Sequence, residues 1–248
     1  MRLEVLGVRK EFLLKDGVRL PVLAGLTFTV PSQGFAALVG PSGCGKSTIL
    51  NILAGLLESD AGEIRIDGQR LSRRTHRIGY VFQKPRLLNW RTVLQNVEFG
   101  LRADGVPAAE RAERARHVLG LVGLDGFAGE YPLSLSGGMQ QRVAIARALV
   151  IEPQVLLMDE PFSHLDELTA RGQRQELLRF RDKINATVVF VTHNALEAVY
   201  LSDCVDVLSA RPTTVTAEFT IDAPRTRRMD DPYLIDLQRT VIRALGAE

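Results

Sequence analysis

The chain of 248 residues has few cysteines and no long apolar run. It contains two cysteines, Cys44 and Cys204, which form no disulfide or metal-binding pattern and agree with a reducing compartment. No uncharged apolar run approaches the ~18 residues that cross a bilayer, and the first residues lack the apolar core of a signal peptide. We therefore expect a protein that is soluble in itself.

The chain also lacks a strong net charge, because 31 basic residues against 29 acidic residues leave +2. Two short basic runs, 70–77 and 225–228, have no aromatic side chains between their charges, as a nucleic-acid platform would require. We interpret both runs as solvated surface and expect no nucleic acid among the partners. The hydrophobic content of 46% and the charged content of 24% are typical of an ordinary globular protein.

Apolar runs bounded by turn residues alternate with helical patterns along most of the chain. The segments expected as strands are 3–8, 22–30, 35–39, 62–67, 77–83, 155–158, 187–192, 205–209 and 215–221. The segments expected as helices are 46–56, 139–150, 167–183, 195–202 and 230–244, with a further helical pattern over 91–124. This alternation indicates an α/β fold with a mostly parallel sheet flanked by helices, preceded by N-terminal antiparallel strands. We expect one domain, 1–248, with a core of 1–83 and 136–248 and an inserted helical subdomain, 84–135.

A glycine-rich segment follows the expected strand 35–39 and leads into the next helix. It matches G-x-x-x-x-G-K-[ST] at every position with Gly40, Pro41, Ser42, Gly43, Cys44, Gly45, Lys46 and Ser47, and Thr48 follows. Glycines let backbone N–H groups point at phosphate oxygens, and the helix start adds positive charge. We expect Lys46 to bridge the β- and γ-phosphates of ATP and Ser47 to bind Mg²⁺. We interpret Cys44 as a small filler of the loop and not as a nucleophile.

A second apolar strand, 155–158, ends in two acids, Asp159 and Glu160. The carboxyl ends of strands are where open α/β sheets bind their ligands. Asp159 is expected to hold Mg²⁺ through water, and Glu160 is expected to polarise the attacking water. Such a pair often only caps the next helix, but the phosphate loop upstream favours the catalytic interpretation.

The segment 135–142, Leu-Ser-Gly-Gly-Met-Gln-Gln-Arg, closely resembles the signature sequence of ABC ATPases. A Ser-Gly-Gly run at a helix start exposes unpaired N–H groups, which make an anion site, and a simple helix cap is the alternative. In the family this motif, here Ser136, Gly137 and Gly138, closes over the nucleotide held by the opposite subunit. The resemblance implies a P-loop NTPase core and a head-to-tail dimer of two copies. Gln140 and Arg142 are interpreted as structural supports.

Other residues match this family in order, so that the resemblance covers nearly the whole chain. Gln83 matches the glutamine that contacts Mg²⁺ and water, and His193 matches the histidine that contacts the γ-phosphate. Phe12 resembles the aromatic residue that stacks on adenine, with a place in the core as the alternative. The segment 163–166 resembles the loop that communicates across the dimer, although His164 stands where the family usually has a small residue.

A narrower resemblance comes from the segment 82–93, which is similar to the corresponding stretch in importers of nitrate, sulfonates and taurine. In the family this segment begins the helical subdomain, where the membrane partner docks. Trp90, the one tryptophan of the chain, marks that surface or belongs to the core.

The resemblance implies an ATP-hydrolysing subunit that powers solute import through a separate permease, at the cytoplasmic face of the inner membrane. A solute-binding protein outside the membrane would be an indirect partner. The serious alternative is the separate ATPase of an exporter. An ABC ATPase that acts on DNA would carry long coiled-coil insertions, and no sustained heptads are present. A translation-associated ABC protein would have two cassettes in one chain, and a small-molecule kinase would not explain the segment 135–142.

Overall fold

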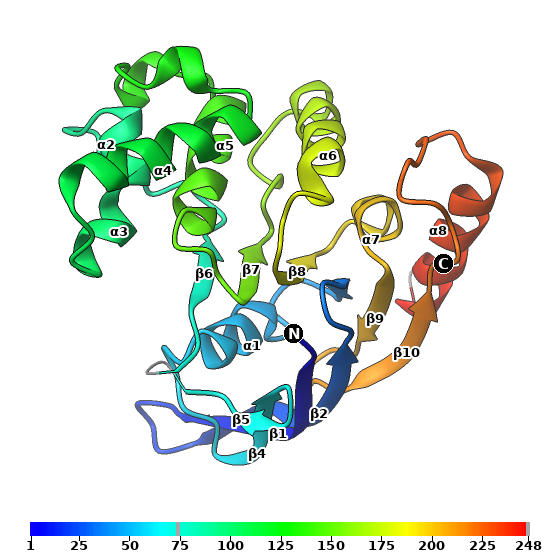
Figure 1. Ribbon diagram of the computed structural model, residues 1–248. Helices are drawn as coiled ribbons and strands as arrows, with labels where there is room; N and C mark the ends of the chain where they lie inside the picture. Colours follow the sequence, from blue (N-terminus) through cyan, green and yellow to red (C-terminus); the bar gives the residue numbers. More distant parts are fainter. Residues whose placement is uncertain (73–74, 247–248) are drawn as a thin grey trace. The chain divides into compact units, whose positions relative to one another are not determined.

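The computed structural model describes residues 1–72 and 75–246, and Figure 1 shows how its helices and strands follow one another. Arg73 and Arg74, in the first basic run, lie outside the described residues. The chain divides into two compact units. The first unit consists of Met1–His76 and Ala186–Glu248, and the second unit consists of Arg77–Asn185.

An antiparallel sheet forms the beginning of the first unit. β1 (Leu3–Leu13) and β2 (Arg19–Val30) pair as a long hairpin, and the strand order is β2–β1–β4–β5 with β4 (Ala61–Ile66) and β5 (Gln69–Arg70). Side chains alternate across a sheet, and β1, β2 and β4 each bury residues of one face. The buried residues include Leu3, Val5, Val8, Leu26, Phe28 and Val30. The predicted N-terminal antiparallel strands are thus confirmed, although the hairpin is longer than expected.

A second sheet of the first unit has the order β10–β9–β3–β8. Its strands are β3 (Phe35–Val39), β8 (Thr187–Thr192), β9 (Cys204–Leu208) and β10 (Val215–Thr220). β3 pairs in parallel with both β8 and β9, and β10 closes the edge in antiparallel pairing. Every residue of β3 and β8 is buried, which explains their continuous apolar sequence.

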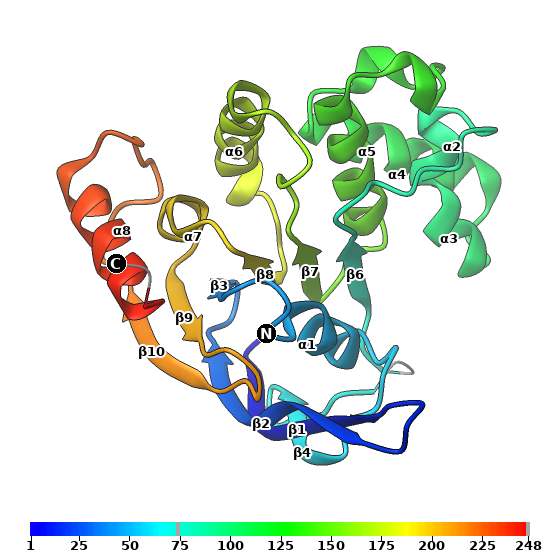
Figure 2. The same ribbon diagram turned by 180° about the vertical axis from the view of Figure 1, so that it is seen from behind.

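Three helices accompany this sheet, namely α1 (Lys46–Leu53), α7 (Ala195–Leu201) and α8 (Pro232–Ala244). α7 packs against β3, and α8 packs against α7. Both views show α7 and α8 side by side (Figures 1 and 2). Asp231 begins α8 as its N-cap and accepts a hydrogen bond from the Tyr233 backbone N–H at 2.9 Å. The sheet and its helices confirm the predicted α/β fold class.

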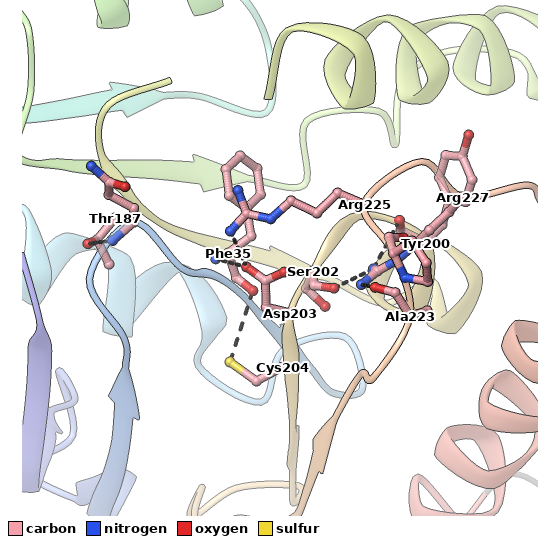
Figure 3. Close-up of polar contacts among 11 residues, drawn as sticks. Phe35, Thr187, Tyr200, Ser202, Asp203, Cys204, Ala223, Arg225 and Arg227 are labelled. Atoms are coloured by element: carbon pink, nitrogen blue, oxygen red, sulfur yellow. Dashed lines mark hydrogen bonds and ion pairs between the residues drawn. The ribbon is translucent and has the colours of Figure 1, made fainter. Parts of the chain in front are cut away.

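Arg227 fastens the C-terminal segment of the first unit to α7 (Figure 3). Its guanidinium is buried and donates to backbone carbonyls of Val199 (3.1 Å), Tyr200 (3.3 Å), Ser202 (2.5 Å), Ala223 (3.3 Å) and Pro224 (3.2 Å). The carbonyls at the end of a helix have no donor within the helix, so an arginine can cap them. The expectation that the basic runs are solvated surface is therefore wrong for Arg227, and it is also wrong for His76, which is buried.

The second unit contains the parallel strands β6 (Ile78–Val81) and β7 (Val155–Asp159). Its helices are α2 (Val93–Val97), α3 (Phe99–Ala103), α4 (Ala108–Leu121), α5 (Gly137–Leu149) and α6 (Glu167–Arg181), with the 3₁₀ turns η1 (Asp125–Phe127) and η2 (Pro132–Ser134). α5 packs against α2, α4, α6 and β6, so it is the central helix of this unit (Figure 2). Within the described residues, no helix has both the length and the apolar content needed to cross a membrane.

The helical pattern expected over 91–124 is present but interrupted. Gly105 has a φ of 73°, in the left-handed region, and ends the run of α2 and α3. Pro107 stands as the N-cap residue of α4, where a missing backbone N–H costs nothing. Within α4, Arg114 and Glu110 form an i,i+4 ion pair at 2.5 Å.

Candidate functional site

The glycine-rich loop 40–45 connects β3 to α1 in the first unit, as the sequence predicts. Gly45 is the N-cap residue of α1 and has a φ of 116°, which residues with a Cβ rarely adopt. A Cβ at this position would also lie 2.8 Å from Val22 Cγ1, so glycine is required on two grounds. The loop thus brings the free N–H groups of a helix start to the carboxyl end of a buried strand.

Lys46 lies across this loop. Its side chain is buried, and its Nζ donates to the carbonyls of Gly40 at 2.8 Å and Pro41 at 3.1 Å. Ser47 follows in the first turn of α1 and is exposed, while Thr48 is partly buried. The ammonium group is therefore held at the loop, and an exposed serine hydroxyl follows it in α1, where phosphate oxygens are expected.

Cys44 fills space beneath the loop. Its side chain is buried, and burial raises the pKa of its thiol, an effect that the nearby Lys46 only partly opposes. The Cys44 carbonyl accepts a hydrogen bond from the Thr213 hydroxyl. A buried thiol that resists ionisation is a poor nucleophile, which supports the interpretation of Cys44 as a filler.

His193 lies at the same edge of the sheet as the phosphate loop. β3 and β8 run in parallel, and Val39 pairs with Thr192 in the register of the two strands. The next residues, Gly40 and His193, therefore leave adjacent strands side by side. His193 is exposed there, in the turn that leads to α7. The first unit thus brings together the loop, Lys46, Ser47 and His193.

The second unit brings together Gln83 and the two acids in the same way. β6 and β7 are parallel, and Val81 pairs with Met158, so that Gln83, Asp159 and Glu160 follow neighbouring strands at their carboxyl ends. The Tyr80 hydroxyl donates to Asp159 Oδ2 at 3.4 Å. Burial, followed by the Asp159 charge, raises the pKa of Tyr80, so the phenol remains a neutral donor to this carboxylate.

Ser163 links Gln83 to Glu160, a contact that sequence reasoning missed. Gln83 Nε2 donates to Ser163 Oγ at 3.0 Å, and Ser163 Oγ donates to the Glu160 carbonyl at 3.1 Å. Glu160 itself has a φ of 41°, a conformation that costs energy in a residue with a side chain. In the following segment, partial burial and the neighbouring Lys84 charge lower the pKa of His164.

Ser136 begins α5 as its N-cap residue, and its Oγ accepts from the Met139 backbone N–H at 3.3 Å. Gly138 is buried, and a Cβ there would lie 2.9 Å from Gln173 Nε2 and 3.1 Å from Thr169 Cγ2. Glycine at this position lets the start of α5 pack directly against α6. Ser136 and Gly137 remain exposed at the helix start.

Two residues in the second half of the segment 135–142 serve as supports, as predicted. Gln140 Nε2 donates to the carbonyls of Pro132 at 2.9 Å and Leu135 at 3.2 Å. Arg142 Nη1 donates to the Val122 carbonyl at 3.1 Å. Both side chains hold the loop that precedes α5, and the prediction of a structural role is confirmed.

For Phe12 and Trp90 the core alternative is wrong. Phe12 is 36% exposed on β1, and the Lys10 ammonium lies 5.7 Å from the centroid of its ring. Trp90 is 75% exposed in the second unit. Near Trp90, Arg147 of α5 donates to the carbonyls of Pro85 at 2.7 Å and Arg86 at 2.9 Å, which fixes the backbone of this segment.

Comparison with known proteins gives matches over most of the chain. A family model described as ABC transporter matches residues 23–163. A taurine import ATP-binding protein of Rhizobium johnstonii is 46% identical over 214 residues, which are 86% of this chain and 82% of that protein. A nitrate import ATP-binding protein of a Synechocystis species is 42% identical over 224 residues, 90% of this chain and 84% of that protein.

A solved structure is similar as well. It is described as the dimeric structure of a post-hydrolysis state of an ATP-binding cassette bound to ADP and Pi. It is 31% identical to this chain, with a TM-score of 0.74, and the match covers 90% of this chain and 100% of that one.

Proposed function

This chain belongs to the ABC transporter family of ATP-binding, ATP-hydrolysing subunits, and we propose that it powers the import of a small solute such as taurine, a sulfonate or nitrate. The observation that carries the proposal is the placement of the phosphate loop and of the pair Asp159–Glu160. The loop directly follows β3, and Asp159 ends β7 with Glu160 next to it; both strands pair in parallel, and α/β sheets bind their ligands at such carboxyl ends.

We assign the residues of the first unit to the phosphates and the base of ATP. The loop N–H groups and Lys46 bind the β- and γ-phosphates, and the buried stem of Lys46 keeps its ammonium group at the loop. His193 contacts the γ-phosphate from the adjacent strand end. Phe12 stacks on adenine, which its exposed ring on β1 allows.

We assign the chemistry of hydrolysis to the second unit. Glu160 accepts a proton from the attacking water, and Gln83 orients that water from the neighbouring strand end. The contacts of Gln83 with Ser163, and of Ser163 with the Glu160 backbone, support this assignment because they fix the two residues relative to each other.

Mg²⁺ fits the oxygen donors of these residues. Ser47 offers an exposed hydroxyl, and Asp159 and Gln83 offer side-chain oxygens, the hard ligands that Mg²⁺ prefers. Among the described residues there is no group of three or more His, Cys, Asp or Glu that could hold a metal. A Mg²⁺ ion whose ligands are mostly phosphate and water oxygens needs no such group. When bound, Mg²⁺ would neutralise charge on the triphosphate.

We further propose that two copies of the chain form a head-to-tail dimer. Ser136, Gly137 and Gly138 of one copy would then bind the γ-phosphate held by the other. Support comes from the exposed start of α5, whose N–H groups suit an anion, and from the solved cassette that is described as dimeric.

The proposed import complex includes a permease and, on the far side of the membrane, a solute-binding protein. The chain would lie at the cytoplasmic face of the inner membrane. We propose the helical subdomain 84–135 as the part that docks the permease, with the exposed Trp90 at its surface. Isolation of the chain with a permease and a solute-binding protein would support import. A permease partner with outward transport of its substrate would instead support an exporter.

The test of the site is the substitution Glu160→Gln. The amide keeps the size of the side chain but cannot accept the proton, so hydrolysis should fall by about 10²–10⁴-fold. ATP binding should persist, because Lys46 and Ser47 are unchanged. Bound ATP should then hold two copies together, giving a dimer in sedimentation with MgATP and a monomer with MgADP.

Glu113→Gln is the matched control, because Glu113 is exposed on α4, away from the strand ends. It should hydrolyse ATP like the unmodified protein. A Glu160→Gln protein that binds ATP but stays monomeric at saturating nucleotide would contradict the shared site. A Glu160→Gln protein with normal turnover would contradict the role of Glu160.

A further inference from the structure

The turn that carries His193 is closed by hydrogen bonds to buried side chains. It joins β8 to α7 and lies wholly within the first unit. Thr192, the last residue of β8, and Glu197, in α7, are both buried. The Thr192 hydroxyl donates to Glu197 Oε2 at 2.7 Å and accepts from the Asn194 backbone N–H at 3.0 Å. The residues on both sides of His193 are therefore tied to one hydroxyl group.

The direction of these hydrogen bonds is determined by the chemistry of the groups. The Asn194 backbone N–H can only donate, so Thr192 Oγ1 accepts from it and directs its own hydrogen at Glu197 Oε2. The lone pairs of that hydroxyl are then left for the Asn194 N–H. Glu197 thus controls where the hydroxyl points and, through it, the backbone of the turn.

The rest of α7 is held independently of this contact. Asn194 Oδ1 accepts from the backbone N–H groups of Leu196 at 2.9 Å and Glu197 at 3.3 Å, which caps the start of the helix. At the other end, Arg227 caps the carbonyls (Figure 3). The helix therefore does not need the hydrogen bond between Thr192 and Glu197 in order to form. We infer that this bond instead fixes the position of the turn that carries His193.

We propose that Glu197 is a positioning residue for ATP hydrolysis, which acts through the Thr192 hydroxyl to hold His193 beside the phosphate loop. The inference rests on the proposed role of His193 at the γ-phosphate. The register of β3 and β8 already brings His193 next to Gly40. The hydrogen bonds remove the remaining freedom of the turn. A catalytic side chain displaced by about 1 Å can lose as much as 10²-fold in rate, so this support matters.

The test compares substitutions at Thr192 that keep or remove the hydroxyl. Thr192→Val keeps the shape of the side chain and its preference for a strand, but it can neither donate to Glu197 nor accept from Asn194. We expect kcat for ATP to fall by about 10–100-fold with KM changed less than about 3-fold, because the phosphate loop is intact. Thr192→Ser restores the hydroxyl and should restore kcat to within about 3-fold of the unmodified protein.

Glu197→Ala removes the same bond from its other end and should reproduce the loss of kcat. This second variant keeps the proposal testable if the valine variant does not fold. Arg227→Met is the control for stability, because it loosens α7 at its far end without touching the turn. A purely structural role predicts that variants with equal loss of melting temperature have equal kcat. A kcat that follows melting temperature across all of these variants, or a Thr192→Val protein with normal kcat, would overturn the proposal.

The substitution His193→Ala separates this inference from the function it rests on. If His193 acts at the γ-phosphate, His193→Ala should lower kcat, and adding Thr192→Val should lower it little further, since the two changes act on one side chain. A His193→Ala protein with normal kcat would refute the role of His193 itself. A low kcat for His193→Ala with losses that multiply in the double variant would refute only the positioning by Glu197.

Discussion

The substitution Asp206→Asn should stabilise the protein by an amount that grows with pH. Asp206 lies on β9, pairs with Leu38 of β3 and Glu218 of β10, and is only 4% exposed. Its Oδ2 has no hydrogen-bond partner among the residues that the structure describes. Burial, and then the charge of Glu218, raises the pKa of the Asp206 carboxyl from 3.8 to about 7. Ionised Asp206 is therefore a cost to the folded state.

The sign and size of the effect follow from proton linkage. Between pH 3.8 and about 7, the folded protein keeps the Asp206 proton while the unfolded chain releases it. The free energy of unfolding therefore falls by about 1.4 kcal/mol for each pH unit in this window and is level above it. Asparagine carries no charge, so the variant lacks this decline. The free energy of unfolding of the variant, relative to that of the unmodified protein, should therefore increase by about 3 kcal/mol between pH 5 and pH 8. All of this increase should occur below about pH 7.

The assay is urea unfolding of both proteins at pH 5, 6, 7 and 8. At each pH, the free energy of unfolding of the unmodified protein is subtracted from that of the variant. Any constant cost of burying the amide cancels when this difference at pH 5 is subtracted from the same difference at pH 8. Asp236→Asn is the matched control, because Asp236 is exposed on α8. If the free energies of unfolding of Asp206→Asn and of the unmodified protein differ by the same amount at every pH in this range, the reasoning is refuted. A Glu218→Gln protein should show a weaker decline than the unmodified protein, because it lacks the like charge that helps to raise the Asp206 pKa.

Four other substitutions give direct tests. Lys46→Ala removes the ammonium group at the phosphate loop, so phosphate release from ATP should fall to background; a normal rate would contradict the site. Charge reversal at Arg86 or Arg91 should weaken co-purification with the permease while nucleotide binding is unchanged, and unchanged co-purification of both variants would count against that surface. Arg227→Met leaves several buried carbonyls without a donor and should lower the free energy of unfolding by about 2–4 kcal/mol in urea titrations. A loss below about 0.5 kcal/mol would show that the cap contributes little.

The buried strands are the part of the fold that the sequence predicts best. β3 was expected at 35–39 and β8 at 187–192, and both strands have these bounds in the structure. Their residues are buried on both faces, so an unbroken apolar run marks each strand from end to end. The helices expected at 167 and 195 begin at these residues in the structure, and Asp166 caps the start of α6 as Asp231 caps that of α8.

The hairpin of β1 and β2 shows what local patterns miss. β1 was expected to end at residue 8, but it continues to Leu13 through charged residues. Lys10 Nζ donates to Asp60 Oδ1 at 2.6 Å, and the Glu11 backbone N–H donates to Asp60 Oδ2 at 2.6 Å. Asp60 lies about fifty residues further along the chain, and no pattern near Lys10 indicates that partner. Burial of Arg227 escaped prediction for the same reason, since its carbonyl partners include residues that precede it by more than twenty positions.

Glu160 and Glu197 show why only part of the candidate site could be proposed from the sequence. Glu160 follows an apolar strand and an aspartate, and the proposed hydrolysis of ATP needs a carboxylate at that strand end, so the chemistry of the ligand suggests the residue. Glu197 stands in an ordinary helical segment, and its partner Thr192 is an ordinary strand residue. The hydrogen bond between them forms because the chain reverses at His193 and Asn194, which places the first turn of α7 next to the end of β8. The type of a residue that contacts a ligand depends on the chemistry of the ligand, and the same ligand occurs in many proteins. The type of a residue that supports it depends on the packing in this one fold. A search for further positioning residues in this chain should therefore begin from buried polar contacts one step behind each predicted site residue.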